Sequence, residues 1–204
     1  MSQHGQHGHT HGEIPASERW VQTYTGRRFY PLEPRPQDVD VVDIAHALGM
    51  ICRYGGHSAQ LYTVGQHSLL VASAVARDYP ERLDWQLMAL MHDASEAYLV
   101  DVPRPIKPFL VGYYEVEARV EACIQRALSL PTDPDGAALV KTYDSRILVD
   151  ECRKLTGNSD WGRSFGEPLG VMISPLSPWQ SERQFLAMYD GLMRGINAAK
   201  MTAK

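Results

Sequence analysis

An apolar stretch at residues 88–107, MALMHDASEAYLVDVPRPIK, carries a histidine and three carboxylates among side chains suited to a buried helix. His92 and Asp93 are adjacent, and Glu96 lies one helical turn beyond His92 if the helix continues. Asp101 follows farther along the chain. Burying an unpaired charge is costly, so these groups need partners. A metal ion could supply one, and a hydrogen-bonded histidine–aspartate pair in the core is the simpler alternative.

Two other residues of metal-ligand type lie on neighbouring helical segments. His67 stands in YTVGQHSLLVA, before the pair, and Asp144 stands in VKTYDSRILVD, after it. Aliphatic residues flank Asp144 at helical spacing, so its carboxylate is expected to face the core, whereas Asp150 is the competing choice on the same helix. With His92 and Asp93, this set of two imidazoles and two carboxylates suits one divalent transition ion, Mn²⁺, Co²⁺, Fe²⁺, Ni²⁺ or Zn²⁺, better than Ca²⁺.

Several side chains near these residues could bind an anion. Arg53 follows an apolar helical segment and precedes two glycines, and its guanidinium has the planar fork that suits phosphate. A charge that satisfies the last carbonyls of that helix is the simpler role for Arg53. His57 stands just after the glycines, and Arg104 and Lys107 lie on a proline-stiffened loop. Each of these residues could contact a phosphate, and each could equally be a solvated surface residue.

The elements that must position these side chains are almost all helices. Residues 20–30, WVQTYTGRRFY, have β-forming residues on both sides of a Thr-Gly turn, which predicts a small hairpin. Apolar periodicity and helix-breaking residues predict helices over 38–54, 64–76, 83–99, 113–130, 137–155 and 178–197. Ser177 is expected to cap the last of these helices. The prediction is therefore an all-α bundle with a small N-terminal β-hairpin.

The first 18 residues differ in composition from the remainder of the chain. They are polar and rich in glycine and histidine, which is typical of a flexible tail. Their four histidines could bind a transition metal loosely, although a plain solvated tail is the simpler interpretation. No internal repeat or second domain is visible, so residues 19–204 are expected to form a single domain.

Composition excludes several classes of protein. The chain has 204 residues and a formal net charge of −4, so no broad basic face predicts binding to a nucleic acid polymer. No apolar run approaches the length of a membrane span, and the N-terminus lacks the features of a signal peptide. The cysteines Cys52, Cys123 and Cys152 are odd in number and lack CxxC spacing, which indicates reduced thiols in a cytoplasmic protein.

Over residues 38–155 the chain resembles the HD-domain phosphohydrolase superfamily, which is named for a pair like His92-Asp93. The segment HDASEAYLVDVPRPIK is similar to bacterial 5′-deoxynucleotidases, which share an H-D-A-S-E core and an acidic residue before a proline pair. The segments DIAHALGMICRYGGH and YTVGQHS look more like phage-associated HD proteins, a group that includes dATP triphosphohydrolases. Gln66 stands where the nucleotidase branch usually has glutamate, which departs from the pattern of enzymes that act on monophosphates.

The resemblance implies a helical HD domain around one metal ion, with these ligands: His67, His92, Asp93 and Asp144. HD phosphodiesterases with two metals recruit further histidines downstream of the pair, and no histidine follows His92 here. An octahedral ion with four protein ligands keeps two positions open, one for water and one for a phosphate oxygen. The ion would lower the pKa of that water, and the activated water would attack phosphorus.

The resemblance also gives roles to residues around the ion. Glu96 matches a glutamate near the attacking water or the leaving group, which implies general acid or base work; orienting His92 is the structural alternative. Asp101 matches an aspartate that contacts the sugar hydroxyl, although a turn aspartate is common at such a position. Arg53 lies about where the nucleotidases keep a phosphate-binding arginine.

We therefore expect a metal-dependent hydrolase of deoxynucleoside 5′-phosphates. It would be a 5′-deoxynucleotidase, which releases phosphate from a monophosphate, or a dNTP triphosphohydrolase, which releases triphosphate. One alternative is a non-catalytic, metal-stabilised HD module that binds a nucleotide or a protein partner. Another is a cyclic-nucleotide phosphodiesterase, which the missing downstream histidines argue against. The expected partner is a small nucleotide, and because the family often forms homo-oligomers, a homo-oligomer is also expected.

Overall fold

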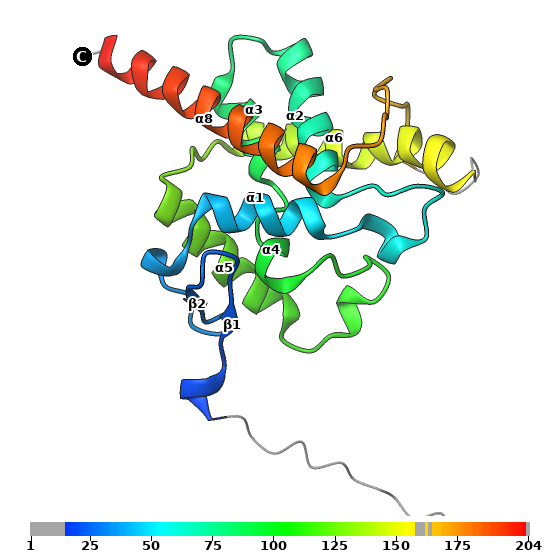
Figure 1. Cartoon of the computed structure of the whole chain (residues 1–204). Coiled ribbons are helices and arrows are strands. Elements are labelled where there is room, and N and C mark those ends of the chain that lie inside the picture. The colour runs from blue at the N-terminus through cyan, green and yellow to red at the C-terminus, as the bar shows by residue number, and fades with distance from the viewer. Residues whose placement is uncertain (1–14, 158–161, 163–164, 203–204) are drawn as a thin grey trace, which may run out of the picture.

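The computed structural model describes residues 15–157, 162 and 165–202 (Figure 1). The four histidines of the predicted tail therefore lie outside the described residues. Of that tail only residues 15–18 are described, and Ala16–Glu18 forms a short exposed 3-10 turn. The expectation that residues 19–204 form a single domain stays a prediction.

The all-α prediction with a small hairpin is confirmed. Strands β1 (Val21–Gln22) and β2 (Arg28–Phe29) pair antiparallel, with Val21 opposite Phe29. The α-helices of the described part of the chain are α1 (Val41–Met50), α2 (Val64–Asp78), α3 (Leu83–Met91), α4 (Glu96–Leu99), α5 (Tyr113–Leu128), α6 (Pro134–Glu151) and α8 (Pro178–Thr202). A π-helical turn, Cys152–Thr156, continues the chain directly after α6.

Side-chain caps explain where several helices begin. The Asp40 carboxylate accepts from the Val42 N–H at the start of α1, and the Thr63 hydroxyl accepts from the Gln66 N–H at the start of α2. At α8 the Ser177 hydroxyl accepts from the Gln180 N–H, and the Gln180 side chain accepts in return from the Ser177 N–H. This reciprocal capping box confirms the predicted start of the last helix.

The apolar core lies where α8 crosses the first helices of the chain. Figure 1 shows α8 running across α1, and α8 also packs on α2 and α3. Gly65 permits the close approach of three of these helices, because a Cβ there would lie 2.7 Å from Ser181 Oγ and 3.2 Å from Gly49 N. Phe185 of α8 is completely buried in this core.

Two predicted helices end earlier than expected. The helix predicted over 83–99 stops at Met91, and α4 begins only at Glu96. Between them the backbone switches to i→i−3 bonds, from Ala94 N–H to Met91 O and from Glu96 N–H to Asp93 O. The prediction that Glu96 lies one turn after His92 on a continuous helix is therefore wrong.

The helix predicted over 38–54 ends at Met50, and Ile51 is extended. Cys52 then pairs with Thr63 in an isolated β-bridge, so the chain folds back on itself before α2. Arg53–Gly56 forms a 3-10 turn in which Tyr54 has a φ of 58°, in the left-handed region. This excursion moves Arg53 from the surface end of a helix to a buried position.

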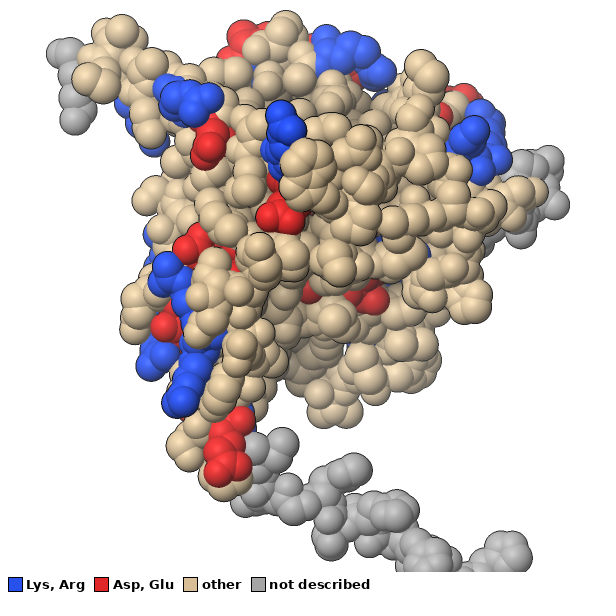
Figure 2. Space-filling view, viewed as in Figure 1, with Lys and Arg blue, Asp and Glu red and all other residues tan. Residues whose placement is uncertain are grey.

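The face of the molecule drawn in Figure 2 has no broad cationic patch. Figure 2 shows lysine and arginine side chains scattered among acidic and uncharged residues on the face in view. Among the described residues, no helix combines the length and the apolar character needed to cross a bilayer.

The close packing at Gly65 generates the first prediction. Gly65→Ala should lower the free energy of unfolding by about 1–3 kcal/mol, because the added methyl would lie 2.7 Å from Ser181 Oγ and 3.2 Å from backbone atoms of α1. Gly191→Ala on α8 is the matched control, since nothing lies within 4 Å of a Cβ there. This control should be neutral or more stable by up to about 1 kcal/mol. Urea unfolding of both variants measures the difference, and equal stabilities would contradict the packing account.

Candidate metal centre

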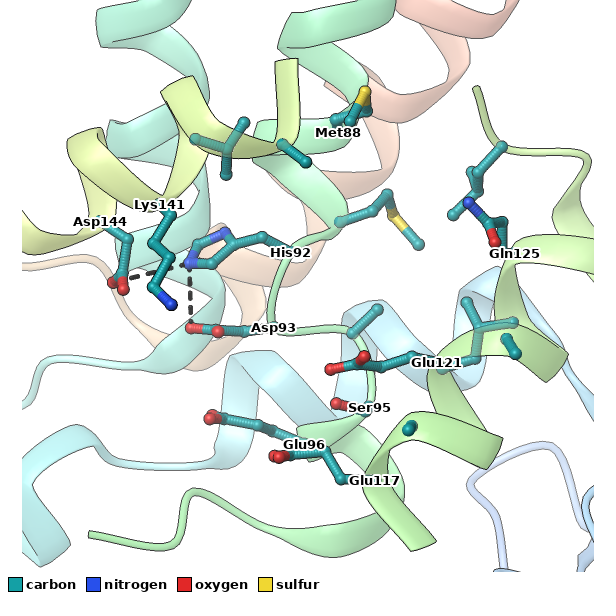
Figure 3. A pocket seen from close by; sticks show the side chains of 18 of the residues that line it. Met88, His92, Asp93, Ser95, Glu96, Glu117, Glu121, Gln125, Lys141 and Asp144 are labelled. Atoms are coloured by element: carbon teal, nitrogen blue, oxygen red, sulfur yellow. Dashed lines mark ion pairs between the residues drawn. The ribbon is translucent and has the colours of Figure 1, made fainter. Parts of the chain in front are cut away.

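Three separate parts of the fold bring four side chains together. His67 comes from the first turn of α2, His92 and Asp93 from the turn after α3, and Asp144 from the middle of α6. Figure 3 shows Asp93 and Asp144 approaching the same nitrogen of His92 from two directions. The sequence-predicted ligands therefore lie together.

The distances within this cluster fit ligands around one ion. Nε2 of His67 lies 3.2 Å from Nε2 of His92 and 3.2 Å from Oδ1 of Asp144. Oδ2 of Asp93 lies 3.3 Å from Nε2 of His92 and 3.7 Å from Nε2 of His67. An ion held at about 2.0–2.2 Å by such atoms keeps neighbouring ligands about 3.0–3.4 Å apart. The His67, His92 and Asp93 group could thus bind a metal ion.

The hydrogen bonds of the two imidazoles point to the same conclusion. Nδ1 of His67 lies 2.7 Å from a carboxylate oxygen of Glu151, and Nδ1 of His92 lies 2.8 Å from the carbonyl oxygen of Ala89. Because both partners are acceptors, both Nδ1 atoms carry the proton. Without an ion, the neighbouring carboxylates raise the pKa of both rings against the opposing effect of burial. In the neutral rings that a metal requires, the lone pairs of Nε2 point toward each other and toward two carboxylates. A cation relieves the repulsion among four such electron-rich atoms.

Glu151 is the residue that the sequence reasoning missed. It is fully buried at the end of α6 and accepts hydrogen bonds from His67 and from the hydroxyls of Tyr54 and Tyr62. Burial alone would raise the pKa of Glu151, but the charge of Arg53 and the hydrogen bonds from His67 and Tyr54 lower it to about 2. The carboxylate therefore stays ionised and fixes the orientation of the His67 ring.

Arg53 lies between Asp93, a proposed metal ligand, and Glu151, which orients the His67 ring. Its Nη1 lies 3.3 Å from Asp93 and its Nη2 lies 3.7 Å from Glu151, and only 9 % of the residue is exposed. A buried guanidinium between these acids balances their charge. The predicted role of Arg53 in binding phosphate stays a prediction, and its ion pairs show a structural task beside it.

Glu96 lies at the edge of the cluster in a distinctive environment. Its side chain is buried, and Oε2 has no hydrogen-bond partner among the described residues. Burial, together with the nearby carboxylates of Asp93 and Asp101, raises the pKa of Glu96 to about 9. Burial also raises the pKa of Asp101. A cavity of 770 Å³ opens beside Glu96 and is also lined by His92, Asp93 and Asp144.

The other predicted binding residues lie at different distances from this centre. Nη2 of Arg104 lies 3.6 Å from Oδ2 of Asp144, and Lys107 lines the cavity while it pairs with Glu117 at 2.9 Å. His57 is exposed and does not line the cavity. Its predicted contact with phosphate or substrate stays a prediction.

Three further polar residues have partners outside the cluster. Asp150 accepts from the Leu169 N–H at 2.7 Å, and among the described residues it has no hydrogen bond or ion pair to the cluster, which favours Asp144 as the ligand on α6. Gln66 donates to the carbonyl of Ser174 and accepts from the Leu176 N–H, so it anchors the segment before α8. The His46 ring stacks on the Tyr24 ring, and its Nδ1 lies 3.0 Å from Oε2 of Glu182.

Comparison with known proteins places the chain in a family. No family model matches it. It is 33% identical over 177 residues to the uncharacterized protein YfdR of Escherichia coli strain K12, a match that covers 85% of this chain and 95% of YfdR. The chain belongs to the YfdR family. The uncharacterized protein RCAP_rcc00048 of Rhodobacter capsulatus is also 33% identical, over 194 residues that cover 87% of this chain and 97% of that protein.

The choice between the two aspartates of α6 can be tested directly. Asp144→Ala should weaken Co²⁺ binding by more than about 100-fold, because losing a ligand costs more than losing an outer partner. Asp150→Ala should bind Co²⁺ as the wild type does. Equilibrium dialysis with metal analysis measures both, and the N-terminal histidines give the same background in every variant. Metal loss in Asp150→Ala alone would show that the wrong aspartate was chosen.

The role of Glu151 can be separated from simple support of the fold. Glu151→Gln keeps the size of the side chain but removes the charge that orients His67, so Co²⁺ affinity should fall by about 10–100-fold. Asp150→Asn, a neighbouring acid-to-amide change on α6, is the matched control. Affinity and the visible spectrum of bound Co²⁺ are the readouts, with melting temperature measured in parallel. Wild-type affinity and spectrum in Glu151→Gln would contradict this role.

Proposed function

We propose that this member of the YfdR family is a metal-dependent hydrolase of deoxynucleoside 5′-phosphates, of the HD-domain phosphohydrolase type. The observation that carries the proposal is the cluster of two imidazoles and two carboxylates at the wall of a 770 Å³ cavity. Glu96, whose buried Oε2 has no hydrogen-bond partner among the described residues, lines the same cavity. Ligand set, free cavity and buried acid together are what hydrolysis of a phosphate ester requires.

The proposed ligands of one divalent transition ion, Co²⁺, Mn²⁺, Fe²⁺, Ni²⁺ or Zn²⁺, are His67, His92, Asp93 and Asp144. When bound, such an ion lowers the pKa of water and offsets negative charge at phosphorus. The protein itself orients the two imidazole rings. Glu151 fixes the orientation of the His67 ring through Nδ1, and the Ala89 carbonyl fixes that of the His92 ring in the same way. The Nε2 atoms of both rings therefore point toward the same position.

Glu96 is the proposed general acid or base. Burial and the neighbouring carboxylates raise the pKa of Glu96, which favours the protonated form that can donate its proton to the leaving oxygen of the ester. Asp101 is proposed to bind the sugar hydroxyl, and Arg53 and Arg104 are proposed to bind the phosphate. Arg104 is the more available of the two because its side chain is 63% exposed.

The substrate is proposed to be a small nucleotide. Positive charge is scattered on the face drawn in Figure 2, and the net charge is −4, so neither supports a nucleic acid polymer as partner. A homo-oligomer is proposed as well. Its support is a group of exposed apolar side chains before and within the start of α5, among them Phe109 and Val111. A cytoplasmic location is supported by the three cysteines, which are all free thiols.

The test is an activity screen with product identification. The metal-loaded protein is incubated with each deoxynucleoside mono- and triphosphate in Co²⁺ or Mn²⁺. Release of phosphate from monophosphates would identify a 5′-deoxynucleotidase, and release of triphosphate would identify a dNTP triphosphohydrolase. No turnover of any nucleotide, with metal bound, would contradict the proposal.

Glu96 gives a sharper prediction about the chemistry. Glu96→Ala should lower kcat by about 10²–10⁴-fold, the usual size of a general acid or base contribution, while metal content stays at the wild-type level. KM should change far less than kcat if the interaction strengthens in the transition state. Glu115→Ala, on the exposed side of α5, is the control and should match the wild type. Near-normal kcat in metal-bound Glu96→Ala would leave Glu96 as scaffold.

A further inference from the structure

The cavity beside the metal centre extends well past the proposed reacting atoms. It lies between the end of α3, α5 and α6. Figure 3 shows Asp144 and Lys141 at one end and Gln125 at the other. Its 770 Å³ falls within the range of about 300–1,000 Å³ that is usual for small-molecule sites. The part of the cavity away from Asp144 has no role in the mechanism proposed above.

One face of α5 presents polar side chains to this cavity. Glu117, Glu121 and Gln125 are spaced four residues apart, so they share the face that lines the cavity. Two acids at this spacing destabilise a helix. Glu117 is compensated by Lys107, but among the described residues the side chains of Glu121 and Gln125 make no hydrogen bond or ion pair. Glu121 is exposed and Gln125 is half-buried, so both polar side chains are open to a molecule that enters the cavity.

Part of the wall away from the metal centre is apolar. Met88 and Met91 of α3, Ile124 of α5 and Val140 of α6 contribute to it. Thioether side chains adapt to flat and irregular surfaces. An apolar wall that faces a few polar groups is the usual design of a site that binds a ring and reads its edge.

The charges around the cavity indicate which part of a substrate it takes. Lys107 and Lys141 are the cations among its lining residues, and Lys107 already pairs with Glu117. The guanidinium groups near the cluster, Arg53 and Arg104, do not line the cavity. The cavity is therefore suited to an uncharged group, and a phosphate chain would be repelled by its acids.

We propose that the distal cavity, the part of the cavity away from Asp144, binds the nucleoside part of the substrate. This inference rests on the proposed function. The base lies against Met88 and Met91, and Glu121 and Gln125 hydrogen-bond to its polar edge. The phosphate then lies at the His92 end, on the side of the arginines. On this proposal α5 determines which nucleotides the protein accepts.

Two adjacent alanines on α6 allow a matched test. Ala137 and Ala138 are both exposed, but only Ala137 lines the cavity. Ala137→Trp should therefore fill the distal cavity and lower kcat/KM for deoxynucleoside monophosphates by about 10–100-fold. Its melting temperature, metal content and inhibition by inorganic phosphate should stay at wild-type values, because the metal end is untouched. Ala138→Trp should match the wild type in every measurement.

A second variant tests the polar face without filling space. Gln125→Leu should lower kcat/KM by about 10-fold for at least one base and change the order of preference among the four deoxynucleoside monophosphates. Wild-type kinetics in both Ala137→Trp and Gln125→Leu, or equal losses in the two tryptophan variants, would overturn the inference alone. Failure of the metal-loaded wild type to hydrolyse any nucleotide would overturn the proposed function and this inference together.

Discussion

The buried imidazole of His67 is the group on which the rest of the site depends. It has no exposed surface, so both ring nitrogens must find partners inside the protein. Nδ1 is held by Glu151, and Nε2 faces His92 and Asp144. These contacts join α2, α6 and the turn after α3 at one point. Packing that displaced any of these elements would leave a polar group unsatisfied in the core.

The composition of the cluster could be predicted from the sequence because its members are set by residue type and helical spacing. His67, His92, Asp93 and Asp144 each stand in an apolar helical context, where an unpaired polar group is costly. Asp144 and Asp150 could be ranked from the aliphatic stripe alone, and the hydrogen bond from Leu169 to Asp150 supports that ranking. The helix start at Ser177 followed from local capping chemistry, which depends on only a few residues.

Tertiary contacts decided what the sequence could not reveal. Glu151 sits at an ordinary helical position beside Asp150, and only the approach of α2 and of the turn at Arg53 gives it partners. The break after Met91 replaces a continuous helix and brings His92 and Asp93 to one point. The left-handed turn at Tyr54 likewise arises where the chain folds back before α2. Each of these features depends on residues that are distant in the sequence.

The central claim is that one divalent ion sits among these four side chains. Crystals of the full-length protein grown with Co²⁺ and measured at the cobalt absorption edge test it directly, because anomalous scattering locates the ion independently of activity. The account predicts one strong peak about 2.0–2.2 Å from Nε2 of His67 and His92 and from oxygens of Asp93 and Asp144. Cobalt found only elsewhere, with no peak among these four residues, would contradict it.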